Sequence, residues 1–194
     1  ATLVRAGETN LLVDVGLSLR ELEGRFKAAS FEGRNVDHIA LSHGHLDHAR
    51  SSGALSSRTG ASLHLCERLM RNRSVERAAR METLRIGSTS DLVSSRAPEA
   101  GTPLELFAIK IPHDADPTVA FRLEHEGRRA VILTDMGEPV PSLRSTLGNA
   151  HVLVLEFNHC ADMLQRGPYP VNLKRRVAGR GGHLSNVQAA AVLE

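Results

Sequence analysis

The chain has 194 residues, of which 41% are hydrophobic and 24% are charged, and its formal net charge is +2. This length suffices for one sizeable core, and this balance is ordinary for a folded globular protein, which excludes a disordered chain. No apolar run approaches the roughly 20 residues that cross a bilayer, and the N-terminus lacks a basic-then-apolar secretory pattern. We therefore expect one cytoplasmic domain over residues 1–194 with no membrane partner, and the sequence leaves the oligomeric state open.

The two cysteines, Cys66 and Cys160, are too few for a disulfide framework, so we expect reduced thiols. The net charge is too small to indicate nucleic-acid binding by itself. The cationic side chains are nevertheless mostly arginine, which grips phosphate through two hydrogen bonds at once. This composition favours a phosphate-bearing substrate only weakly.

The chain is predicted to begin with a hairpin and a helix. Residues 2–4 and 10–15 have the β-branched and aliphatic pattern of paired strands. Ser18 followed by Glu21 is a capping-box pattern, which predicts that an amphipathic helix begins there.

Further strands are indicated by aliphatic and β-branched runs at residues 36–41, 62–65, 104–111, 118–124, 130–134 and 152–157. Helices are expected at residues 48–58, ending before Gly60, at 67–81, as two short helices around 167–170, and after a second capping box at Ser185 and Gln188. Residues 83–100 collect Ser, Gly and Pro and predict a loop with room for an edge strand.

The segment Ser42 to His48 reads Ser-His-Gly-His-Leu-Asp-His and follows the strand at 36–41 directly. It holds four potential ligands, which are His43, His45, Asp47 and His48. Imidazole nitrogens and carboxylate oxygens suit zinc and similar divalent ions. A polar loop that is merely rich in histidine is the alternative, and the tight spacing favours metal ligation.

Other predicted strands also end in candidate ligands. His113 follows one strand, Asp135 another, and the group from Glu156 to His159 a third. Taken alone, His113 is as well explained as a structural histidine and Asp135 as a turn former. A two-metal site needs about six donors of this kind around ions roughly 3.5–4 Å apart, so their joint position indicates metal ligation.

The histidine segment resembles the H-x-H-x-D-H motif of the metallo-β-lactamase-fold hydrolases, and His113 and Asp135 match that superfamily's third and fourth motifs. Within it, residues 111–115, 155–159 and the stretch from 167–170 through 182–186 resemble the YycJ/WalJ group, small bacterial enzymes regarded as DNA or RNA exonuclease-like.

The resemblance implies an α/β fold, the four-layer αββα metallo-β-lactamase sandwich, truncated here at both ends. It also implies two divalent metal ions, zinc or manganese, at one edge of the sheets. By motif, one ion would be held by His43, His45 and His113 and the other by Asp47 and His48, with Asp135 as the bridge. Hydroxide between the ions would then attack phosphorus.

A related phosphodiesterase family, the tRNase Z type, has a glutamate and a histidine that match Glu156 and His183. The resemblance implies that this pair delivers a proton to the leaving alkoxide. Asp47, Glu156 and His183 are thus the expected catalytic residues. In the YycJ/WalJ group a later His-Leu-Ser segment follows the last helix, and we expect such a segment beyond Glu194 to complete the second metal site.

Several other polar residues are weaker candidates for a functional role. Asn158 and His159 are expected to contact substrate or phosphate, with a structural histidine as the alternative. Structural roles are expected for three other histidines, His38, His64 and His151. The run from Lys174 to Arg176 is either a solvated helix face or a contact with a nucleic-acid backbone.

The sequence therefore predicts a binuclear metal-dependent hydrolase, a phosphodiesterase or exonuclease acting on DNA or RNA. The fold also hosts other chemistry, so a thioester or lactone hydrolase is one alternative. A non-catalytic nucleic-acid-binding module is the other.

Overall fold

The computed structural model describes residues 1–99, 101–141 and 143–193. The chain folds as two compact units, Ala1–Ala108 and Ile109–Glu194. The expectation of one domain over the whole chain stays a prediction. Among the described residues, no helix is long and apolar enough to cross a membrane.

The Ala1–Ala108 unit contains a five-stranded mixed sheet in the order β1-β2-β3-β4-β5. Its strands are β1 (Thr2–Ala6), β2 (Thr9–Val13), β3 (His38–Ala40), β4 (Ser62–Leu65) and β5 (Arg80–Thr83). β1 and β2 form the predicted antiparallel hairpin, and each later strand pairs in parallel with its neighbour. The C-terminal ends of β3 and β4 therefore lie at one edge, which is where the histidine segment begins.

The helices of this unit are α1 (Leu19–Ala28), α2 (Leu46–Ala49) and α3 (Ser52–Thr59), with three 3-10 turns, η1 (Gly33–Asn35), η2 (Glu67–Arg71) and η3 (Arg73–Val75). The predicted capping box at the start of α1 is confirmed, because Ser18 accepts from the N–H of Glu21 and Glu21 accepts from the N–H of Ser18. α3 ends, as predicted, at Gly60, which adopts φ 80°.

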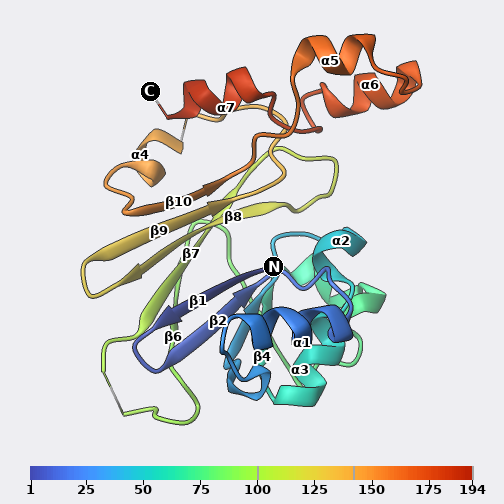
Figure 1. The fold of residues 1–194 in the computed structure, drawn as a ribbon. Helices are drawn as coiled ribbons and strands as arrows, with labels where there is room; N and C mark the ends of the chain where they lie inside the picture. Colours follow the sequence, from blue (N-terminus) through green and yellow to red (C-terminus); the bar gives the residue numbers. More distant parts are fainter. Residues whose placement is uncertain (100, 142, 194) are drawn as a thin grey trace. The chain divides into compact units, whose positions relative to one another are not determined.

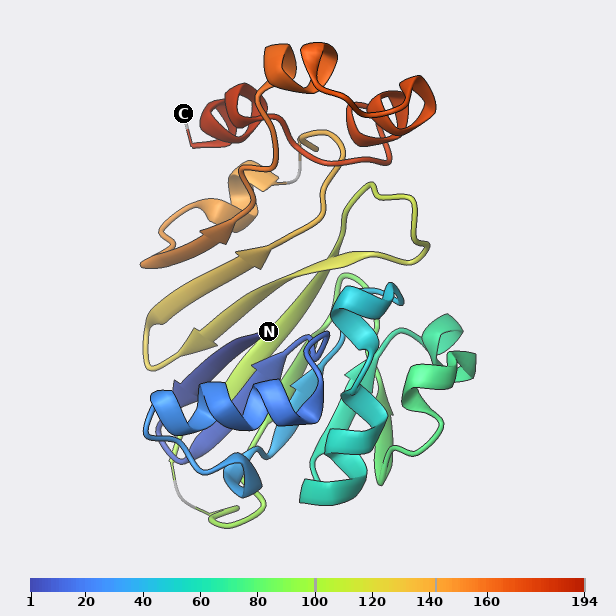
Figure 2. The same cartoon turned by 45° about the vertical axis from the view of Figure 1, so that its right-hand side comes forward.

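α1 and α3 lie on the same side of the sheet (Figure 1, Figure 2). Leu22 and Phe26 of α1 and Leu55 of α3 join Ile39 and Leu63 of the strands in one buried cluster. Burial of such side chains contributes about 1.5–3 kcal/mol each, which fixes the sheet that carries the histidine segment.

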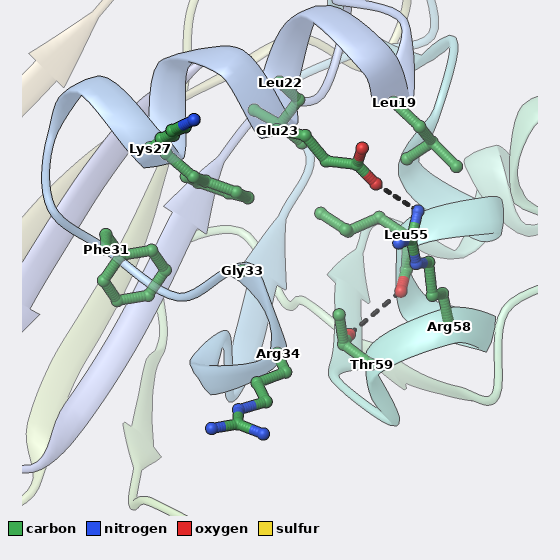
Figure 3. A pocket seen from close by; sticks show the side chains of 11 residues that line it. Leu19, Leu22, Glu23, Lys27, Phe31, Gly33, Arg34, Leu55, Arg58 and Thr59 are labelled. Carbon is green, nitrogen blue, oxygen red and sulfur yellow. Dashed lines mark hydrogen bonds and ion pairs between the residues drawn. The ribbon is translucent and has the colours of Figure 1, made fainter.

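A small cavity of about 340 Å³ opens between α1 and α3 (Figure 3). The side chain of Glu23 on α1 pairs there with Arg58 on α3, and Thr59 donates to the carbonyl of Leu55 at 2.9 Å. Phe31 lies at the other end of the cavity, where it packs edge-on against Phe26. The cavity is thus a gap in helix packing that is bridged by an ion pair.

The predicted helix over residues 67–81 is wrong. That stretch forms the two 3-10 turns η2 and η3 and then β5, whose residues pair in parallel with β4. Asn72 ends the first turn and its side chain caps the second, which breaks the helical run. Hydrogen bonding to the sheet edge outweighs the weak helical spacing of the apolar residues.

A second mixed sheet contains β6 to β10. The strands are β6 (Thr89–Leu92), β7 (Leu104–Lys110), β8 (Val119–His125), β9 (Arg128–Leu133) and β10 (Val152–Leu155). β6 occupies the loop where an edge strand was expected, and it pairs antiparallel with β7. β8 and β9 form an antiparallel hairpin, and β10 runs parallel to β9. The strands at the predicted positions are confirmed, with shifts at their ends.

The Ile109–Glu194 unit has four described helices, α4 (Leu143–Leu147), α5 (Ala161–Arg166), α6 (Val171–Val177) and α7 (Asn186–Val192). α5, α6 and α7 follow β10 and lie together beyond the ends of β9 and β10 (Figure 1, Figure 2). The second predicted capping box is confirmed, since Ser185 and Gln188 bond reciprocally at the start of α7. This cap fixes where the His183 segment turns into a helix.

Candidate active site

The histidine segment is held by the end of β2. The N–H of Val15 donates to the carbonyl of His48 at 2.6 Å, and the N–H of Ser51 donates to Val15 at 2.9 Å. A Cβ on Gly16 would lie 1.4 Å from the carbonyl oxygen of Asp47, so only glycine allows this approach. The backbone of α2 is therefore fixed before any ligand binds.

Three imidazoles converge in this segment. The ring centroids of His43 and His45 are 4.7 Å apart, and those of His43 and His48 are 4.2 Å apart. His43 is fully buried, whereas the side chain of Asp47 is 82% exposed with Oδ2 3.8 Å from Nε2 of His48. The four predicted ligands of the segment thus form one group.

Asp14 sets the orientation of two of these rings. Its Oδ2 accepts from Nδ1 of His48 and from the hydroxyl of Ser42, both at 2.8 Å. Since that hydroxyl donates to Asp14, it accepts from Nδ1 of His43 at 3.0 Å. A carboxylate can only accept, so Nδ1 carries a proton in both rings, and a ring that is neutral has its lone pair on Nε2.

The sequence placed Asp14 only within the predicted strand at residues 10–15. Its part in the site is invisible there, because the partners lie 28 and 34 positions away. One local signal points to it in the structure, which is its left-handed φ of 58° in a buried position. Asp tolerates that conformation when its side chain is well bonded.

His113 is oriented by a different kind of partner. Its Nδ1 donates to the carbonyl of Gly182 at 2.9 Å, so a neutral ring here has its lone pair on Nε2. Nε2 lies 3.3 Å from the carboxylate of Asp114, and that carboxylate accepts from Arg176 at 2.6 Å. A Cβ on Gly182 would lie 2.2 Å from the carbonyls of Arg176 and Val177, so glycine is required here too.

Asp135, Glu156 and His183 form a second group of possible ligands. Each offers one ligand atom, and these atoms all lie within 4.8 Å of one another. Nδ1 of His183 lies 3.0 Å from Glu156 and 3.3 Å from Asp135. Asp135 itself adopts a left-handed φ of 52° just after β9.

Glu156 is fixed by the backbone on either side of the group. Its Oε1 accepts from the N–H of Met136 at 2.6 Å and from that of Leu184 at 3.2 Å. The pKa of His183 is raised to about 10, because its imidazole donates to Asp135 and to Glu156, with burial opposing the shift. In the absence of metal, His183 therefore carries a proton at neutral pH.

Asn158 and His159 lie next to this group in the chain. The N–H of Asn158 donates to Leu184 at 3.2 Å, and the N–H of Asn186 donates to His159 at 2.8 Å. The pKa of His159 is lowered, first by burial and then by the charge of His183. These backbone hydrogen bonds hold the segment after β10 against the His183 segment. That Asn158 and His159 contact the substrate stays a prediction.

The three histidines expected to be structural have structural bonds. His38 and His64 bond to each other at 2.9 Å. His151 accepts from the N–H of Arg129 at 3.1 Å. Cys66 and Cys160 are free thiols, as expected.

The donors fit divalent zinc or manganese. The predicted ligand set contains only imidazole nitrogen and carboxylate oxygen, and its members are His43, His45, Asp47, His48, His113 and Asp135. Three of the imidazoles have their orientation set through Nδ1, as metal-binding histidines have. The set draws on both units, and as a complete coordination sphere it stays a prediction.

The chain belongs to the metallo-beta-lactamase superfamily, which it matches over residues 1–171. It is thus a hydrolase of this fold with groups suited to divalent metal, and the expected αββα fold class is confirmed.

Among curated proteins, it is similar to exodeoxyribonuclease YycJ of Bacillus anthracis, with 28% identity over 98% of this chain and 70% of the relative. It is also similar to exodeoxyribonuclease WalJ of Streptococcus pneumoniae, with 25% identity over the same shares. Among solved structures, the metallo-beta-lactamase fold protein YhfI of Bacillus subtilis has a TM-score of 0.68 at 17% identity, over 99% of this chain and 72% of that one.

Proposed function

We propose that the chain is a metal-dependent phosphodiesterase that digests DNA or RNA from an end. The observation that carries this proposal is the Glu156–His183 pair beside Asp135. The relatives named exodeoxyribonuclease support it, since the similarity covers 98% of the chain.

We assign the metal ligands as His43, His45, Asp47, His48, His113 and Asp135. Two divalent ions in such a site supply Lewis acidity and a water of lowered pKa. Asp14 and Gly182 keep the lone pairs of His48 and His113 on Nε2, which is the nitrogen that a metal needs.

A proton donor at His183 suits a phosphodiester better than a thioester. A sugar alkoxide leaves readily only when it takes a proton, whereas a thiolate leaves without one. Glu156 holds Nδ1 of His183, so Nε2 is the nitrogen that donates to the leaving oxygen. Asn158 and His159 then contact the substrate beside this pair.

The test uses labelled single-stranded DNA and RNA with Mn²⁺ or Zn²⁺. We expect metal-dependent release of nucleotides from an end, and loss of that activity in His45→Ala and Asp135→Ala. Metal-loaded protein that cleaves neither strand would refute the proposal. Rapid turnover of thioesters or lactones without that of bis(p-nitrophenyl) phosphate would favour the carbon-ester alternative.

The proton-donor assignment has its own test. His183→Ala should slow oligonucleotide cleavage by about 10²–10⁴-fold. It should slow bis(p-nitrophenyl) phosphate much less, because p-nitrophenolate leaves without a proton. Equal losses on both substrates would show that His183 acts otherwise.

A further inference from the structure

The Ile109–Glu194 unit has a pocket of about 520 Å³ next to the Glu156–His183 pair. It is formed by the turn after β10, helix α5, the turn between α5 and α6, and the start of α7. Its apolar lining includes Met163, Leu164, Pro168 and Tyr169, and its polar lining includes Asn158 and Asn186. The ring of Tyr169 is 56% exposed, so it is open to a ligand.

The lining selects for a flat, neutral ring with polar edges. The residues that line the pocket include no Asp, Glu, Lys or Arg in the described part of the chain. Each of the two amides offers both a donor and an acceptor, which is the pattern that the edge of a nucleobase requires. An aromatic side chain supplies the stacking surface that every base accepts.

The pocket and the catalytic pair are built from the same two segments. Asn158 is two positions after Glu156, and Asn186 is three positions after His183. Backbone hydrogen bonds join these segments between Asn158 and Leu184 and between Asn186 and His159. A base in the pocket is therefore held at a fixed place beside the proton donor.

Cations follow the pocket along the chain. Residues 161–180 carry one acidic side chain, Asp162, and five basic ones, which are Arg166, Lys174, Arg175, Arg176 and Arg180. Some have protein partners, such as Arg176 with Asp114 at 2.6 Å. The part of the chain that lines the pocket therefore continues into a basic segment, and basic side chains attract phosphate.

We propose that this pocket binds the base of the terminal nucleotide of a single-stranded nucleic acid. The base stacks on Tyr169, and the amides of Asn158 and Asn186 bond to its edge. The inference rests on the proposed phosphodiesterase function and adds the feature that selects a strand end.

Cys160 provides a probe that needs no turnover. It lines the pocket and is exposed, whereas Cys66 is buried and reports on folding. The rate of Cys160 alkylation by iodoacetamide is followed by mass spectrometry in EDTA, with a short single-stranded oligonucleotide added. We expect the oligonucleotide to protect Cys160, and the same strand with abasic residues at both ends to protect it much less.

Variants test the stacking surface. Tyr169→Ala should raise the oligonucleotide concentration that halves the rate of Cys160 alkylation by about tenfold, because one stacking contact with a base is lost. Tyr169→Phe keeps the ring, so this concentration should stay near that of the parent. Val171→Ala is a matched control, since Val171 is exposed and close in sequence but does not line the pocket.

Three results would overturn the proposal. They are equal protection by intact and abasic strands, equal half-protection in Tyr169→Ala and the parent, and protection by free deoxynucleoside monophosphate as good as that by the strand. The last would make the pocket a site for free nucleotides. If the bases protect Cys160 but the chain cleaves no nucleic acid, the base-binding pocket is supported and the phosphodiesterase function is refuted. Failure of the pocket proposal can therefore be distinguished from failure of the proposed function.

Discussion

Acid should destabilise the Ala1–Ala108 unit through one buried histidine pair. Nδ1 of His38 lies 2.9 Å from Nε2 of His64, and Nε2 of His38 lies 2.8 Å from the carbonyl of Val93. That carbonyl can only accept, so His38 donates to it and accepts from His64. In this arrangement His38 is neutral, and His64, which is only 7% exposed, donates to it through Nε2.

The magnitude follows from the pKa of His64. Burial, and secondly the charge of His38, lower this pKa from 6.5 to about 4. Between these two values the unfolded chain binds more protons than the folded one, so stability falls as the pH falls. The loss begins below about pH 6.5 and is complete below about pH 4, and it amounts to about 3 kcal/mol.

The assay is urea unfolding in EDTA from about pH 7 to about pH 4.5, for the parent and for His64→Gln. Glutamine keeps an N–H donor toward His38 but does not titrate, so the variant should lose less stability over this range. His151→Gln removes an exposed histidine outside the pair and should follow the parent. Parallel losses in the parent and in His64→Gln would refute the reasoning.

Three other substitutions test contacts of the same unit. Asp14→Asn should lower metal affinity about 10- to 100-fold, measured by competition with a chromophoric chelator, and unchanged affinity would contradict its orienting role. Gly16→Ala should lower the free energy of unfolding in urea by about 1–3 kcal/mol, because the Cβ of the alanine would overlap the backbone of α2. Asp37→Asn should lower the free energy of unfolding by about 3 kcal/mol, since the buried carboxylate accepts from the backbone of Asn10 and from Arg96, both at 2.9 Å. A decrease below about 1 kcal/mol would mean that other bonds replace these two.

Local patterns predicted the parts of the fold that are decided locally. The capping boxes at Ser18 and Ser185 each lie within four residues, and both begin helices. The helix expected at 67–81 failed because β5 is specified by its partner β4, which is distant in sequence. The proposed ligands follow strand ends and could be suggested from the sequence, whereas the partners Asp14 and Gly182 could not, since those contacts span 34 and 69 positions.

The hydrogen-bond partners of Nδ1 also distinguish the expected chemical roles of His113 and His183. A metal ligand must offer a lone pair, and a proton donor must keep its proton. Nδ1 of His113 donates to a neutral carbonyl, and the one carboxylate described beside this ring, that of Asp114, lies 3.3 Å from its other nitrogen, Nε2. Nδ1 of His183 instead lies between two carboxylates, which stabilise the charged imidazolium. This difference in the partners of Nδ1 supports the assignment of His113 to metal binding and of His183 to proton transfer, although His113 bonds to Gly182, the residue directly before His183.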